Sequence, residues 1–222
     1  RLLMNNNNTI KAEKNKIYGK KIINEYELNH LIYDEALIYD KRTFFQIYFS
    51  IVKYNNLILF TFVPMNDFNL RTIKVSLFLI SFSLYFTVNC FFFSDDSMHK
   101  IYIECGKYNF ENQVLQMLYS LIISSSINTL LKLISLSGKN ILLIKKQSNL
   151  KDALKQSKKI QKSEKIKIII FYIISFLILL LLWYFISCFC AVYVNTQKIL
   201  IYDTLISFGT SMIYPLGLYL LI

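Results

Sequence analysis

Four long stretches of the chain are almost free of charged residues. Residues 75–93, 168–194 and 204–222 contain no Asp, Glu, Lys or Arg, and residues 114–137 contain only Lys132. A helix needs about 20 apolar residues to cross a hydrocarbon core roughly 30 Å thick. The pattern therefore predicts an all-α helical membrane protein, a bundle of four transmembrane helices that pack against one another. Lys132 is close enough to the end of its span to reach the headgroups.

The apolar stretch at residues 43–63 is less regular, because Lys53 and two asparagines interrupt it. A lysine at the centre of a span costs about 2.5–3.5 kcal/mol on insertion scales. We interpret residues 43–53 as an amphipathic helix at the membrane interface, followed by a short buried or re-entrant piece that ends at Pro64. A broken span is the alternative interpretation.

The distribution of Lys and Arg predicts the orientation of the spans. Eleven of these residues lie before residue 75, two in 94–113, ten in 138–167 and one in 195–203. Basic segments stay on the cytoplasmic side of a membrane. We therefore expect residues 1–42 to be a polar, partly ordered cytoplasmic lead-in to a membrane domain at 43–222. The basic loop at 138–167 is expected on the same side.

Composition agrees with this pattern and limits the classes of function. Only 18% of the residues are charged, against about a quarter in soluble domains, and the mean hydropathy is +0.40. The net charge of +11 is accounted for by the cytoplasmic segments, so we expect no nucleic-acid partner. The sequence has no Gly-rich phosphate loop, HExxH, CxxC or nucleophile elbow. We therefore expect no enzyme activity and no catalytic, cofactor-binding or metal-binding residues.

The basic loop is the one segment with a predicted binding surface. Apolar residues recur among its lysines, which is typical of a basic amphipathic helix or helical hairpin. Such a segment is attracted to anionic cytoplasmic lipid by about 1 kcal/mol for each lysine near the surface. The candidate lipid-surface residues are Lys145, Lys146, Lys151, Lys155, Lys158, Lys159 and Lys162. A calmodulin-type partner fits the same pattern, and lysines that act only as topology signals are an equally good interpretation.

Two further groups of polar residues have a chemical and a structural interpretation. Asp95, Asp96 and His99 carry the side chains of a divalent-cation site, but acidic residues at a helix end are common and we favour that role. The hydroxyl-rich stretch 124–129 indicates either close helix packing or a permeation path. We favour packing, because a path normally adds an intramembrane acid, Arg or His, and none is placed there.

The four cysteines fall on the non-basic side of the predicted membrane. They are Cys90, Cys105, Cys188 and Cys190. A disulfide from Cys105 to one of the other three is one interpretation, since that side is oxidising if it faces a lumen or the exterior. Free buried thiols are the interpretation we favour.

Segments 40–69, 94–102 and 183–215 carry a resemblance to a known family. Over residues 34–222 the chain resembles a family of uncharacterised multi-pass transmembrane proteins of ciliates and other protists. The resemblance implies the multi-pass architecture and no assigned activity.

The predicted bundle contains no recognisable site, and the chain opens on Arg1 and stops within an apolar run. We therefore expect a non-enzymatic integral membrane domain that acts as an anchor or assembly module of a larger protein. A transporter or channel subunit is the alternative.

Overall fold

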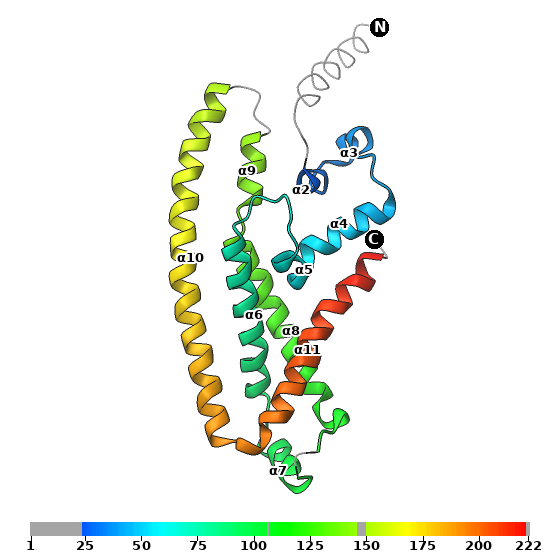
Figure 1. Cartoon of the computed structure of the whole chain (residues 1–222), viewed down its shortest axis with the longest axis vertical. Coiled ribbons are helices and arrows are strands. Elements are labelled where there is room, and N and C mark those ends of the chain that lie inside the picture. The colour runs from blue at the N-terminus through cyan, green and yellow to red at the C-terminus, as the bar shows by residue number, and fades with distance from the viewer. Residues whose placement is uncertain (1–23, 106, 146–149, 221–222) are drawn as a thin grey trace.

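In this computed structural model the described residues are 24–105, 107–145 and 150–220, and every regular element within them is helical (Figure 1). The prediction of an all-α bundle is confirmed. In chain order the helices are α2 (Glu25–Leu28), α3 (Tyr33–Tyr39), α4 (Phe44–Asn55), α5 (Leu57–Phe62), α6 (Arg71–Phe91), α7 (Asp95–Ile103), α8 (Phe110–Ser135), α9 (Gly138–Lys145), α10 (Leu150–Val192), the 3₁₀ turn η1 (Val194–Thr196) and α11 (Gln197–Leu220).

Among the described residues, four helices are long and apolar enough to cross a membrane: α6, α8, α10 and α11. Helix α6 contacts each of the other three and lies at the centre of the bundle. The bundle has two distinct ends (Figure 1): α7 lies at one, and α2, α3 and the beginning of α10 lie at the other. Large apolar side chains such as Ile173, Leu181 and Trp183 are exposed along α10. Such a surface is typical of a helix that faces lipid, because soluble monomers rarely expose continuous apolar patches.

Helix α10 is longer than the uncharged run that predicted it. It begins at Leu150 rather than at Ile168 and continues for 43 residues. At 1.5 Å of rise per residue it is about 65 Å long, roughly twice the thickness of a hydrocarbon core. The segment 150–167 has no Gly or Pro, so nothing in it interrupts the helix. Its lysines therefore lie on a continuous helical extension of the span.

Helix α11 also begins earlier than predicted. The uncharged run starts at Thr204, whereas α11 starts at Gln197 and includes Asp203. The prediction placed this acid in a loop because hydropathy treats a charged residue as the end of a span. That boundary is wrong: the helix continues through Asp203, whose side chain is fully buried.

Residues 43–63 form two short helices. Helix α4 begins at a capping box formed by Thr43 and Gln46, and Asn56 ends α4 and caps α5. With 12 and 6 residues, neither helix alone is long enough to cross a membrane, and the alternative of a broken span stays a prediction. The predicted amphipathic helix and short buried piece are both present; their place relative to a membrane stays a prediction.

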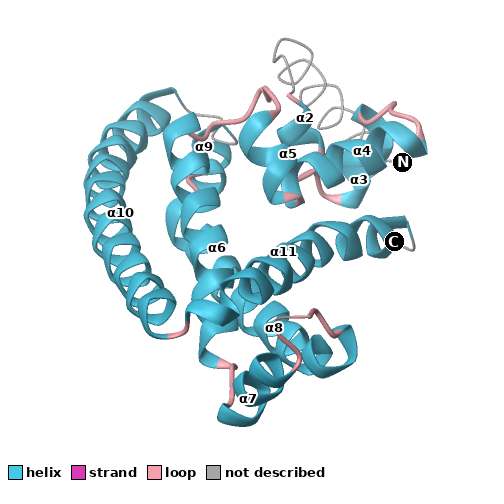
Figure 2. Cartoon of the chain, turned by 60° about the horizontal axis from the view of Figure 1, so that its bottom comes forward, coloured by secondary structure: helices cyan, strands magenta, loops and turns pink. Residues whose placement is uncertain are grey.

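Helices α4 and α5 lie beside the C-terminal half of α11 (Figure 2). The Tyr48 hydroxyl donates to the Leu216 carbonyl at 3.0 Å, and Asn56 Nδ2 donates to the Met212 carbonyl at 3.0 Å. The described part of the lead-in is packed as well. The Tyr26 ring makes edge contacts with Tyr54 and Phe68 at 5.4 and 5.8 Å. Residues 1–23 of the predicted lead-in lie outside the described residues.

Aromatic side chains form the apolar core between α6 and α11. Phe208 of α11 meets the rings of Phe78, Phe82 and Tyr85 edge to face, with centroids 6.0, 5.3 and 5.5 Å away. Edge-to-face pairs at this separation contribute about 0.5–1.5 kcal/mol each beyond the area they bury. This contact fixes how α11 crosses the central helix.

A buried ion pair holds the segment before α6 against that helix. Lys74 Nζ lies 2.7 Å from Asp67 Oδ1, and the two side chains are only 6% and 2% exposed. Lys74 also lies over the Phe60 ring at 4.5 Å, and Asn69 donates to the second oxygen of Asp67 at 2.9 Å. The pair is thus fully bonded although it has almost no contact with solvent.

Removing one partner of this pair should be more damaging than removing both. We expect Lys74→Met or Asp67→Leu alone to lower the free energy of unfolding by about 3–5 kcal/mol, because each leaves an unpaired buried charge. The double variant should recover part of that loss. Unfolding in detergent micelles measures the effect, with Lys100→Met on the exposed side of α7 as the control. Single variants as stable as the control would contradict this prediction.

Candidate functional site

The most unusual chemical feature of the bundle is a carboxyl group inside a candidate span. Asp203 lies in the second turn of α11 and is 0% exposed. The positions one and four residues later, Thr204 and Ser207, are buried on the same side of the helix. All three lie in the half of the bundle near α7 (Figure 1).

Side chains from α6 and α8 complete this polar cluster. Gln116 of α8 donates from Nε2 to the Asn89 carbonyl at 3.2 Å and to Asp203 Oδ2 at 3.4 Å. Asn89 of α6 donates from Nδ2 to Thr204 Oγ1 at 3.2 Å and to Ser207 Oγ at 3.1 Å. Three of the four candidate spans therefore meet through hydrogen bonds at one level of the bundle.

Several buried oxygens in the cluster and along α8 have no hydrogen-bond partner among the described residues. They are Asp203 Oδ1, Asn89 Oδ1, Gln113 Oε1, Ser120 Oγ and Ser124 Oγ. A serine on a helix commonly donates to the carbonyl four residues earlier, as Ser207 does to Asp203 at 2.7 Å. Ser120 and Ser124 do not. An unsatisfied polar group away from water costs about 1–3 kcal/mol, so helix packing alone does not account for these five atoms.

No ion pair within the described ranges involves Asp203; those observed join Arg42 with Asp40, Lys74 with Asp67 and Lys167 with Glu164. The neighbour of Asp203 on the α7 side is Tyr108, which lies before α8. Burial and, secondarily, the carboxyl of Asp203 raise the pKa of the Tyr108 phenol above its ordinary value. The phenol therefore stays protonated beside the carboxyl group.

A polar crevice lies in the opposite half of the bundle. It has a volume of about 420 Å³ and lies between α5, α6, α8 and α11. Its polar lining includes Ser81, Asn128, Lys132 and Ser211. Lys132 Nζ donates to the Asn55 carbonyl at 3.2 Å, and Asn128 donates to Ser81 at 2.7 Å.

One face of α8 connects the crevice to the Asp203 cluster. Polar residues occupy every fourth position along this face: Gln116, Ser120, Ser124, Asn128 and Lys132. Positions four apart form a ridge that a crossing helix contacts along its length. Helix α11 follows this ridge with its own polar positions, from Asp203 through Ser207 to Ser211. A nearly continuous polar path therefore runs between three apolar helices.

The hydroxyl-rich stretch singled out in the sequence contributes only partly to this path. Ser124 is fully buried and Asn128 bonds α6, whereas Ser125, Ser126 and Thr129 donate to carbonyls of their own helix. The sequence interpretation missed Asp203, Asn89 and Gln116. The spacing of four that runs through α8 and α11 was the available signal.

The candidate lipid-surface lysines do not form one surface. Lys145 belongs to α9, Lys146 lies outside the described residues, and Lys151, Lys155, Lys158, Lys159 and Lys162 are exposed on the extension of α10. A helix that continues into a span cannot also lie flat on the membrane. With 1.5 Å of rise per residue, Lys162 lies about 9 Å and Lys151 about 26 Å beyond Ile168. Lipid binding stays a prediction, and the geometry limits it to the lysines nearest the span.

The other candidates are placed at the α7 end. Asp95 and Asp96 occupy the first turn of α7, after the N-cap Ser94, and both are exposed. Across the described ranges, no three His, Cys, Asp or Glu side chains come together as metal ligands. All four cysteines are free thiols, and only Cys90 is buried.

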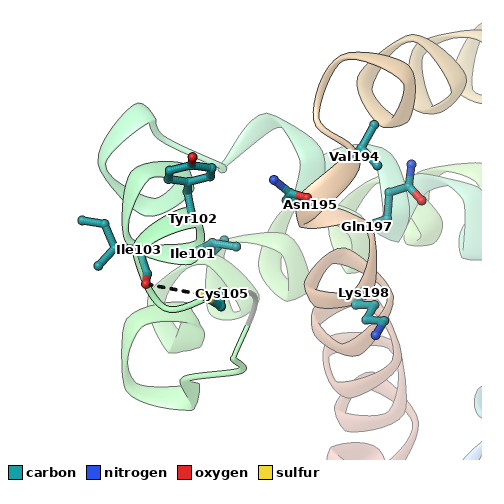
Figure 3. A pocket seen from close by; sticks show the side chains of 8 residues that line it. All are labelled: Ile101, Tyr102, Ile103, Cys105, Val194, Asn195, Gln197 and Lys198. Atoms are coloured by element: carbon teal, nitrogen blue, oxygen red, sulfur yellow. Dashed lines mark hydrogen bonds between the residues drawn. The ribbon is translucent and has the colours of Figure 1, made fainter.

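A second hollow, of about 760 Å³, lies between the end of α7 and the turn η1 (Figure 3). Its lining includes Tyr102, Cys105, Asn195 and Lys198. Figure 3 shows that the labelled side chains point in different directions and do not converge on one point. Cys105 makes only a weak contact, at 3.9 Å, with the Ile103 carbonyl. The Asp203 cluster is therefore the better candidate site.

Comparison with known proteins finds no family model, no curated protein and no solved structure that matches this chain. The resemblance to a protist family stays a prediction. The site must be interpreted from its own geometry.

Substitutions of Asn89 and of Ser120 should have opposite effects on the stability of the protein, because Asn89 forms hydrogen bonds and the Ser120 hydroxyl forms none. Asn89→Leu removes two interhelical bonds, each contributing about 0.6–1.7 kcal/mol in a membrane protein, so we expect a loss of about 1–3 kcal/mol of stability. Ser120→Ala removes a buried hydroxyl that bonds nothing, so stability should not fall and should rise by up to about 1–3 kcal/mol. Thermal unfolding in detergent compares the two; equal losses would contradict the described bonding.

Proposed function

We propose that this chain is the membrane domain of a transporter or channel that moves a small polar solute or ion across the bilayer. The observation that carries the proposal is Asp203, fully buried in a candidate span without a positively charged partner among the described residues. Ionisable residues inside a membrane are rare and energetically expensive, and they mark ion or substrate pathways.

The arrangement of the other polar groups supports the same function. A pathway needs polar groups at successive depths of the membrane. Three groups follow one another along the bundle: the crevice at Lys132, the serines at 124 and 120, and the Asp203 cluster. Apolar helices enclose this series on the outside. Pro215 lies within α11 beside the crevice, where the helix lacks one backbone hydrogen bond.

An anchor or assembly module remains the second candidate, because the bonds from Asn128 to Ser81 and from Asn89 to Thr204 would also serve helix association. An anchor needs only packed apolar helices, however, and gains nothing from unpaired buried oxygens. The two functions differ in whether the purified protein supports flux.

We propose further that the basic end of the bundle is cytoplasmic and that the α7 end faces the other side, since Lys and Arg are retained on the cytoplasmic side. Cysteines introduced at Ser97 and Lys155, in a chain whose native cysteines are replaced by serine, test this orientation. An impermeant thiol reagent added to intact cells should label the Ser97→Cys variant, and the Lys155→Cys variant only after permeabilisation. The reverse pattern would invert the topology.

Flux through the reconstituted protein tests the function. We expect liposomes that contain the full chain to dissipate an imposed cation gradient faster than protein-free liposomes do. Asp203→Asn keeps the size of the side chain but removes the acid, and should reduce the flux to near the protein-free level. Asp95→Asn, an exposed acid on α7, is the matched control and should retain it. Absence of flux under ion, proton and solute gradients would favour the anchor.

A further inference from the structure

We propose that Asp203, Asn89 and Gln113 bind one monovalent metal cation at the α7 end of the polar path. This assignment rests on the transport function proposed above and names the class of ion that the site takes. Its starting point is a set of buried oxygens without a hydrogen-bond partner among the described residues, which includes both amide oxygens of Asn89 and Gln113 and one oxygen of Asp203.

The donor atoms at the site are of one chemical type. Asp203 offers a carboxylate oxygen, Asn89 and Gln113 offer amide oxygens, and Ser120 offers a hydroxyl oxygen one turn beyond Gln116. Hard cations prefer oxygen ligands of this kind, whereas imidazole and thiolate suit transition metals. The donor set therefore selects a hard cation.

Hydrogen bonds fix which atoms remain available for a ligand. Both N–H groups of the Asn89 amide are used, by Thr204 and Ser207, so Oδ1 is the atom left unbonded. Gln116 Nε2 contacts Asp203 Oδ2 at 3.4 Å and leaves Oδ1 without a partner. Gln113 lies one turn before Gln116, on the same face of α8. Thr204, Ser207 and Gln116 are thus positioning residues for the proposed ligands.

The charge at the site selects a monovalent ion. Asp203 is the one acid in the cluster. Among the described residues, no group of three His, Cys, Asp or Glu side chains brings a second carboxylate to it. A monovalent cation would neutralise it, whereas a divalent cation would leave a net positive charge buried in a medium of low dielectric constant. Unpaired buried charges cost several kcal/mol, so the neutral combination is favoured.

The number of unpartnered acceptors favours a metal cation over a proton. A proton on Asp203 would add a single donor, and a single donor satisfies one acceptor. Asn89 Oδ1 and Gln113 Oε1 both accept and neither has a donor among the described residues. A cation is coordinated by several oxygens at once and satisfies the carboxylate and both amides together.

Binding of radioactive sodium to the purified full chain in detergent, without any gradient, tests the site directly. We expect saturable binding of one ion per chain, displaced by unlabelled sodium but not by an equal concentration of choline, which is too large to be coordinated by these oxygens. Asp203→Asn should weaken binding by about tenfold or more, and Gln116→Leu by about 10–100-fold, as loss of an orienting partner does at other metal sites. Asp95→Asn is the control and should bind as the wild-type chain does.

The outcomes separate this inference from the proposed function. No sodium binding by the wild-type chain, or displacement by choline as effective as by sodium, overturns the assignment whatever the variants do. Flux that depends on Asp203 but responds only to a proton gradient also overturns it, and leaves the transport function standing. Sodium binding that Asp203→Asn abolishes, in a protein that shows no flux, supports the site and rejects the transport function. If the Asp203→Asn variant does not fold, the assignment is decided by sodium binding to the Gln116→Leu variant and by the competition experiment on the wild-type chain.

Discussion

A carboxyl group without access to water constrains every helix that approaches it. In hydrocarbon neither the backbone nor a polar side chain can bond solvent, so each must find a partner within the protein. Asp203 meets this constraint in part, through Gln116 and the protonated phenol of Tyr108, and Gln116 in turn contacts the backbone of Asn89. The approach of α6, α8 and α11 to one another follows from these contacts. Their register is fixed because a shift of one residue would turn the polar positions toward lipid.

Apolar contacts between the helices also stabilise the bundle, and they lie on other helix faces than the polar path. The rings of α6 pack around Phe208, so α11 is held by aromatic contacts on one face and by hydrogen bonds on another. At the basic end, Asn56 and Tyr48 bond carbonyls near Pro215. The short helices α4 and α5 therefore support the part of α11 where its own hydrogen bonding is interrupted.

Helix α10 has a different role from the three helices that share the polar cluster. Its outward face is apolar and exposed, and within the membrane-length part it packs mainly on α6. Beyond that part it continues as a basic rod, because no helix breaker separates the lysines from the span. Glu164 of this rod contacts Ser137, Asn140 and Lys167 and so ties α10 to the start of α9. The basic extension is thus fixed to the bundle at its base.

The sequence by itself determined the class of the fold and the approximate positions of the four candidate spans, because the free energy of placing residues in hydrocarbon depends mainly on their composition. It also contained the helix caps at Thr43 and Asn56, whose local chemistry needs no distant partner. Only the tertiary structure decided which polar residues face one another. Asp203 looked like the end of a loop, since hydropathy assigns a charge the same cost whether it faces lipid or the bundle. Its burial beside Asn89 and Gln116 depends on contacts between residues 87 to 115 positions apart, and pairing over that distance leaves no mark in local composition.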